Sequence, residues 1–138
     1  DDGNIGLDVY GMEISQWAVN HSMVQDRIYQ GDVTTKDLSK LFGGNDLVIA
    51  YDLLEHVDYE NINTAIQNII QCSNKYILIS VPTLGDINLE KDPTHRIKET
   101  KDWWLNKFLE HRCVPINTPK SFLYCEQLMI FEVPKNES

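Results

Sequence analysis

Apolar residues recur along the chain in two patterns, one typical of buried strands and the other of amphipathic helices. The clearest strand is Asp46–Tyr51, in which Leu47–Ala50 are all apolar, so it can be covered on both faces as parallel strands usually are. The clearest helix is Tyr59–Cys72, whose apolar stripe is Ile62, Ala65, Ile66, Ile69 and Ile70. This alternation predicts an α/β fold with a parallel sheet and helices on both faces.

The other segments continue the alternation of strands and helices. Further strands are predicted at Leu7–Ile14, Arg27–Gln30, Tyr76–Val81, Cys113–Ile116 and Gln127–Val133. Helices are predicted at Ser15–Ser22, at Thr34–Leu41 (a short helix or a turn) and at Glu99–His111, and a long loop at Thr83–Thr94. The last two strands have no helix between them, which indicates an antiparallel hairpin at one edge of the sheet.

Composition narrows the function classes. The 138 residues fit one domain, and the formal net charge of -9 argues against non-specific binding to nucleic acid or to an anionic membrane surface. The sequence has no membrane-spanning apolar run and no signal peptide. Its three cysteines form no CxxC pair, and Asp92 with His95 offers only two ligands, so we expect no metal site and reduced thiols in a cytoplasmic protein.

Polar residues gather directly after the strand Asp46–Tyr51, in Asp52-Leu53-Leu54-Glu55-His56. Open α/β sheets bind ligands at the carboxyl ends of their strands, so a site is predicted here. Asp52 and Glu55 can line a pocket, or they can simply complement the dipole of the next helix. His56 and His95 can act as general bases, but a structural role for His56 and an exposed loop position for His95 fit equally well.

The ordered set of segments resembles the class I S-adenosylmethionine-dependent methyltransferases, especially those acting on small molecules, from about Val9 to Lys135. The resemblance rests on VYGMEIS, Gly31-Asp32-Val33, Asp52-Leu53-Leu54-Glu55-His56, SVPT at Ser80–Thr83, Asp92-Pro93-Thr94-His95 before Trp103-Trp104, and the terminal hairpin. It implies a Rossmann-like three-layer sandwich with a mostly parallel sheet and a C-terminal antiparallel hairpin. It also implies S-adenosylmethionine as cofactor.

The resemblance implies a role for each candidate residue. The residues implied to bind the cofactor are Glu13 at the ribose hydroxyls with Ile14 beside it, Asp32 and Val33 at the adenine, and Asp52. The residues implied to face the substrate are Glu55 and Trp103, with His56 or His95 as the base. Simpler interpretations remain open: Glu13 as a solvated charge, Asp32 as a turn residue, and Trp103 as a packing residue.

One part of the family pattern is missing from the sequence. The first strand and its glycine-rich loop are absent, and Gly3, Gly6 and Gly11 do not replace that loop. We therefore expect a methyltransferase-like domain that is incomplete at its N-terminus and binds the cofactor weakly or not at all. The missing strand would lie between Leu7–Ile14 and Asp46–Tyr51, the segments that match the second and fourth strands of the family. These two strands either pair directly, accept another chain between them or leave an open edge, which favours a homo-oligomer.

Two other functions stay open at this point. A non-catalytic methyltransferase-like remnant that serves as an interaction or oligomerisation module would fit the missing glycine-rich loop. A nicotinamide-dependent oxidoreductase would suit Glu13 after a second strand, but it suits the Asp52–His56 segment and the terminal hairpin less.

Overall fold

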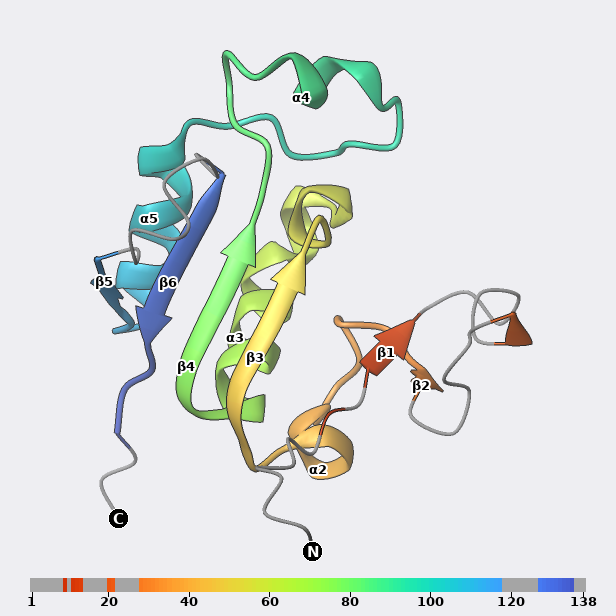
Figure 1. The fold of residues 1–138 in the computed structure, drawn as a ribbon, viewed down its shortest axis with the longest axis vertical. Coiled ribbons are helices and arrows are strands. Elements are labelled where there is room, and N and C mark those ends of the chain that lie inside the picture. Colours follow the sequence, from red (N-terminus) through yellow and green to blue (C-terminus); the bar gives the residue numbers. More distant parts are fainter. Residues whose placement is uncertain (1–8, 10, 14–19, 22–27, 118–126, 136–138) are drawn as a thin grey trace, which may run out of the picture.

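The computed structural model describes residues 9, 11–13, 20–21, 28–117 and 127–135 (Figure 1). The strands are β1 (Gly11–Glu13), β2 (Ile28–Gln30), β3 (Asn45–Tyr51), β4 (Ser73–Ser80), β5 (Val114–Ile116) and β6 (Leu128–Glu132). The helices are α2 (Ser39–Phe42), α3 (Ile62–Cys72), α4 (Ile87–Lys91) and α5 (Lys101–Glu110), with 3-10 turns η2 (Leu54–His56) and η3 (Tyr59–Asn61). Each predicted strand has a counterpart, whereas the helix predicted at Ser15–Ser22 lies mostly outside the described residues.

The strands form two hydrogen-bonded groups. Strands β1 and β2 pair in parallel, and the second group has the order β3-β4-β6-β5. Within it β3 and β4 are parallel, whereas β6 is antiparallel to both of its neighbours. The predicted terminal hairpin of β5 and β6 is therefore confirmed. Direct pairing of β1 with β3, one of the arrangements expected from the sequence, does not occur in the part of the chain that the structure describes.

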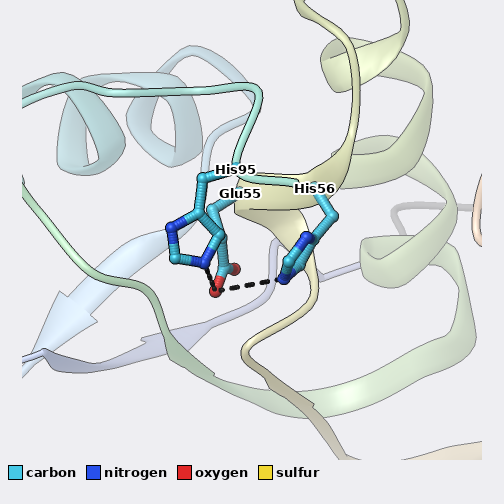
Figure 2. Close-up of side chains that lie close together, drawn as sticks. All are labelled: Glu55, His56 and His95. Carbon is cyan, nitrogen blue, oxygen red and sulfur yellow. Dashed lines mark ion pairs between the residues drawn. The ribbon is translucent and has the colours of Figure 1, made fainter. Parts of the chain in front are cut away.

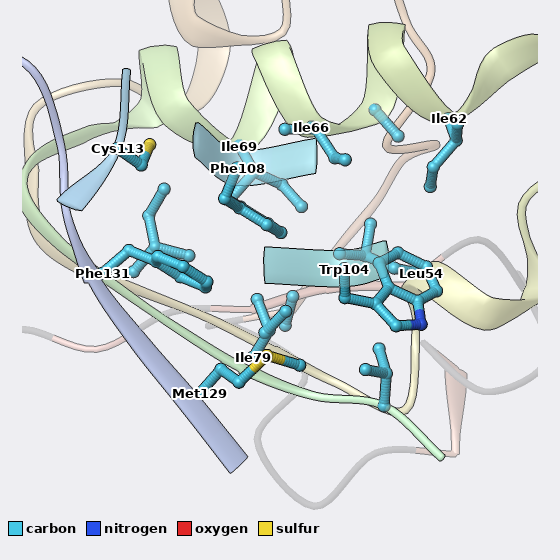
Figure 3. Close-up of a cluster of buried hydrophobic side chains, with 14 of the residues drawn as sticks. Leu54, Ile62, Ile66, Ile69, Ile79, Trp104, Phe108, Cys113, Met129 and Phe131 are labelled. Atoms are coloured by element: carbon cyan, nitrogen blue, oxygen red, sulfur yellow. The ribbon is translucent and has the colours of Figure 1, made fainter. Parts of the chain in front are cut away.

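The main core lies between one face of the β3–β6 sheet and the two longest helices (Figure 3). Ile77 and Ile79 alternate along β4, so they point to the same face, where they pair with Phe131 and Met129 of β6. The apolar stripe of α3 packs there, and so do Trp104 and Phe108 of α5. The Phe108 and Phe131 rings are stacked, with centroids 4.4 Å apart. Both helices therefore cover the same face of the sheet.

The opposite face of β3 is open to solvent. Its side chains Leu47, Ile49 and Tyr51 are 47%, 60% and 61% exposed. In Figure 1, α3 lies behind β3 and β4, so the exposed face of β3 is the one toward the viewer. Among the described residues, the helices thus cover one face of the sheet, whereas the sequence predicted helices on both faces. The α/β class and the mixed sheet agree with the sequence prediction.

Two segments differ from the prediction, each for a local reason. The predicted loop Thr83–Thr94 contains α4, because the Asp86 carboxylate caps the helix by accepting from the Asn88 N–H at 2.9 Å, and Leu89 is buried. Strand β4 begins at Ser73, directly after α3 and three residues earlier than predicted. None of the described helices could cross a bilayer, since the longest, α3, has 11 residues.

Candidate functional site

Three side chains converge above the carboxyl ends of β3 and β4: Glu55 and His56 from η2, and His95 from the segment after α4 (Figure 2). The Glu55 Oε2 atom lies 4.0 Å from Nε2 of His56 and 3.9 Å from Nε2 of His95. The Asp92 Oδ2 atom lies 3.6 Å from the same His95 nitrogen. The structure therefore brings together Glu55, predicted to face the substrate, and the two predicted bases, His56 and His95.

The end of β3 turns sharply to place Glu55. Asp52 has a φ of 51°, in the left-handed region that Asp tolerates better than most residues. Its N–H donates to the Ser80 carbonyl at 2.9 Å, so the turn stays joined to the end of β4. Leu54 is fully buried in the core and holds η2 against it. The side chain of the next residue, Glu55, is thereby carried inward, while Asp52 itself is exposed.

The segment after α4 is attached to η2 by its backbone. The N–H groups of Arg96 and Ile97 both donate to the Glu55 carbonyl, at 2.7 and 3.0 Å. Ile97 is fully buried and anchors this segment in the core. Because β3 and β4 are parallel, the segments that follow them meet at one edge of the sheet, and this contact positions His95 next to Glu55.

Hydrogen bonds fix the orientation of both imidazole rings. The Nδ1 atom of His95 lies 2.9 Å from the Leu89 carbonyl oxygen, and that of His56 lies 3.2 Å from the Thr94 carbonyl oxygen. A carbonyl only accepts, so Nδ1 carries the proton in each ring, and in the neutral ring Nε2 holds a lone pair. Both Nε2 atoms face Glu55.

Thr94 adds a second contact to His56. Its hydroxyl oxygen lies 3.0 Å from Nδ1 of His56 and 2.5 Å from Oδ1 of Asp92. The hydroxyl donates to the carboxylate and accepts from the ring, and this bonding lowers the pKa of Asp92 below its usual range. The sequence analysis missed this role of Thr94, although a hydroxyl two residues after an Asp is a known turn signal.

The Glu55 carboxyl group is buried without a partner. Its side chain is 1% exposed, and neither oxygen has a hydrogen-bond partner among the described residues. The pKa of Glu55 is raised from its ordinary 4.5 to about 7, chiefly by burial and also by the negative charge of Asp52, whereas its own backbone N–H and His95 oppose the shift. A buried carboxyl without a hydrogen-bond partner is costly, so this group marks a candidate functional site.

The residues predicted at the adenine lie after β2. The Asp32 Oδ1 atom accepts from the N–H and the hydroxyl of Thr34, at 2.9 and 2.7 Å, which closes a tight turn. Val33 is 6% exposed and belongs to the core, so little of its side chain is free for a ligand. The buried Asn68 of α3 donates to the carbonyls of Val33 and Thr35, at 2.7 and 2.8 Å. This turn is therefore attached to the sheet through α3.

The other candidates lie apart from the cluster. Trp103 is partly exposed on α5, where its ring meets Tyr59 edge-on at 6.0 Å and Trp104 at 4.9 Å, with the Lys107 ammonium 5.3 Å away. Trp104 is fully buried, so only one of the two adjacent tryptophans points fully into the core. Glu13 is the last residue of β1, and Ile14 lies outside the described residues.

Comparison with known proteins identifies the fold. No protein family model matches the chain, and no curated protein matches it significantly. Among solved structures, it resembles an S-adenosylmethionine-dependent methyltransferase from Archaeoglobus fulgidus, with a TM-score of 0.67 and 14% identity, over 89% of this chain and 75% of that one. The chain therefore has the fold of the class I methyltransferases.

Two further similar structures contain SAH, the demethylated cofactor product. PigF with SAH matches 91% of this chain and 43% of its own length, at a TM-score of 0.62 and 16% identity. Magnesium protoporphyrin IX methyltransferase from Synechocystis PCC 6803 with bound SAH matches 93% of this chain and 64% of its own length, at a TM-score of 0.55 and 17% identity. The chain thus spans less than two thirds of either protein.

Proposed function

We propose that this chain takes part in the transfer of a methyl group from S-adenosylmethionine to a small-molecule acceptor. The observation that carries the proposal is the cluster of the buried Glu55 with His56 and His95 at the carboxyl ends of two parallel strands, in a fold shared with methyltransferases. The formal net charge of -9 favours a small acceptor over a nucleic acid.

The cofactor would lie along the ends of β1, β2 and β3. Glu13 ends β1, Asp32 follows β2 and Asp52 follows β3, so three acidic residues come after successive strands. Their carboxylates can accept hydrogen bonds from the ribose hydroxyls and from the adenine amine. Because the sequence holds no closely spaced glycines after a strand that could receive the methionine part, we propose that this chain alone binds the cofactor weakly.

The histidines supply the base that a hydroxyl acceptor needs. With Nδ1 protonated toward a carbonyl, the Nε2 atom of His56 or His95 can take the acceptor proton. The acceptor oxygen then forms a bond to the methyl carbon as the carbon–sulfur bond breaks, and the electron pair of that bond stays on sulfur as the neutral thioether. His56 is the better candidate to reach an acceptor, since its side chain is 34% exposed and that of His95 only 7%.

Binding of radiolabelled S-adenosylmethionine in equilibrium dialysis tests this proposal. Asp32→Ala removes a proposed cofactor contact. Asp37→Asn is its control, since Asp37 is exposed, its carboxylate pairs with the exposed Lys40, and Asn tolerates the left-handed backbone there (φ 58°). We expect wild type and the control to bind alike, and Asp32→Ala to bind at least about 10-fold more weakly, as for loss of a hydrogen bond to a charged group. Equal binding by all three proteins would refute the assignment of Asp32.

A second candidate function is self-association, and the open side of β3 favours it. Leu47, Ile49 and Tyr51 form an exposed apolar strand face, beside an edge of β3 that pairs with no other strand among the described residues. Proteins normally cover such a combination. We propose that a second copy of the chain covers this strand face.

The buried thiols Cys72 and Cys113 are free, which fits the reducing cytoplasm proposed for the protein.

Sedimentation velocity distinguishes this candidate from a monomer. Ile49→Lys places a charge on the strand face, and Ile87→Lys, at an equally exposed isoleucine of α4, is the control. We expect a wild-type dimer that Ile49→Lys dissociates and Ile87→Lys leaves intact. A wild-type monomer at high micromolar concentration would remove the oligomerisation module from consideration.

A further inference from the structure

We infer that Glu55, His56 and His95 form a binding site for a divalent transition-metal ion of the zinc class. Each residue offers one ligand atom, and these atoms all lie within 4.8 Å of one another. No other group of three such residues comes together in the described residues. The inference concerns metal binding by the chain itself and stands whether or not the chain transfers methyl groups.

Electron pairs of the three side chains point at one place, and no hydrogen-bond donor among the described residues bonds to the Glu55 oxygens there. The Nδ1 atoms of both histidines are bound to carbonyl oxygens, which leaves the Nε2 lone pairs directed at Oε2 of Glu55. The carboxylate oxygens are also acceptors, and neither has a partner among the described residues. Acceptors that face one another need a proton or a metal cation between them; the proton that Glu55 keeps when no metal is bound can satisfy one ring nitrogen, whereas a metal ion in its place satisfies all three groups at once.

The second argument is geometry. Zinc binds imidazole nitrogen and carboxylate oxygen at about 2.0–2.2 Å, which in a tetrahedron places ligand atoms roughly 3.3–3.5 Å apart. The two distances from Oε2 of Glu55 to the ring nitrogens are 4.0 and 3.9 Å. A shift of about 0.5 Å in each side chain therefore reaches bonding distance, within the range of a side-chain torsion adjustment.

The third argument is the support around the ligands. A metal-binding histidine usually donates its other N–H to a carbonyl or carboxylate, which fixes the ring, and both histidines do so here. Thr94 strengthens this for His56, because its hydroxyl also accepts from that ring while it donates to Asp92. The cluster thus has the surroundings of a built site in addition to the ligands themselves.

The donor set selects the class of ion. Two imidazole nitrogens and one carboxylate suit Zn²⁺, Co²⁺ or Ni²⁺ better than Mg²⁺ or Ca²⁺, which prefer oxygen ligands. Three protein ligands leave a position open, and the exposed part of the His56 side chain provides access to it. At that position the ion would polarise an acceptor hydroxyl in place of the histidine base, because a bound metal takes the Nε2 lone pairs. This role rests on the proposed methyl transfer, whereas metal binding does not.

Co²⁺ titration tests the site directly, because a protein-bound Co²⁺ ion has a visible absorption band. The chain is freed of metal with a chelator, dialysed and titrated with Co²⁺, and Zn²⁺ is then added in competition. We expect binding of one ion per chain, with the band lost as Zn²⁺ replaces Co²⁺. Absence of saturable binding at micromolar metal would overturn the inference, even if the chain binds S-adenosylmethionine.

Variants separate this site from adventitious binding. Glu55→Gln and His56→Gln each remove a ligand while preserving side-chain size, and we expect each to weaken binding by more than about 100-fold. Thr94→Val removes the hydroxyl that contacts His56 and Asp92 but no ligand, and it should weaken metal binding by about 10-fold. His111→Gln is the control, because His111 lies outside the cluster. Equal affinity in Glu55→Gln, His56→Gln and the control, with circular dichroism unchanged, would also overturn the inference.

Discussion

Asn68 joins the turn that carries Asp32 to helix α3, and its replacement tests that link. The side chain is 5% exposed, and its amide donates to the carbonyls of Val33 and Thr35. In Asn68→Ala both bonds are lost, at a net cost of about 1 kcal/mol each, and the carbonyl of the buried Val33 loses this donor, which adds to the penalty. We expect the free energy of unfolding to fall by about 2–3 kcal/mol.

Urea denaturation measures this loss, and hydrogen exchange locates it. With a urea slope of about 2 kcal/mol/M, the unfolding midpoint should fall by roughly 1 M. Exchange of the Thr34 and Thr35 amides, which bond to Asp32, should accelerate more than exchange in β4. Gln67→Ala, an exposed change on the same helix, is the control. An Asn68→Ala midpoint equal to that of the control would refute the link between α3 and the turn.

Three further changes test the core and the cluster. The first test is the pH dependence of stability in metal-free protein with a chelator present. Glu55 keeps its proton up to about pH 7 in the folded state but loses it near pH 4.5 when unfolded. The free energy of unfolding should therefore fall by about 3 kcal/mol as the pH rises through that window, and it should not fall in Glu55→Gln. A pH profile shared by both proteins in urea unfolding would contradict this. Phe108→Ala should lower the free energy of unfolding by about 3–5 kcal/mol. A double-mutant cycle with Phe131→Ala should show a coupling energy of about 1 kcal/mol between the two rings, whereas additive losses would argue against the stack. Burial raises the pKa of Cys113 to about 11, so in a Cys72→Ser/Cys125→Ser background its thiol should react with a disulfide reagent only after unfolding, and fast labelling of folded protein would contradict its burial.

The strands and the two long helices were predictable because each has a regular pattern. The apolar run before Asp52 and the helical stripe of Ile62–Ile70 depend only on local sequence and on which side of the segment is buried. Helix α4 was missed because its signal is short: one cap at Asp86 and one buried apolar residue, Leu89, whereas the neighbouring Ile87 is exposed. Such a helix is decided by tertiary contacts rather than by periodicity.

The candidate site was predictable in position but not in arrangement. The carboxyl ends of parallel strands meet at one edge, so the sequence could place Glu55, His56 and His95 near one another. It could not show that Glu55 is buried without a partner, or that carbonyl oxygens fix both rings, because those facts depend on the path of residues 92–97. The sequence analysis therefore paired His95 with Asp92 alone and did not consider three ligands together.

The central claim, cofactor binding along the ends of β1, β2 and β3, is tested most directly by nuclear magnetic resonance. Backbone amide shifts of the labelled chain are followed as S-adenosylhomocysteine is added to millimolar concentration, where weak binding is still detected. The account predicts saturable shifts centred on Asp32, Val33 and Asp52, with β5 unaffected. Absence of shifts at millimolar ligand, or shifts confined to the opposite end of the sheet around Asn74 and Arg112, would contradict it.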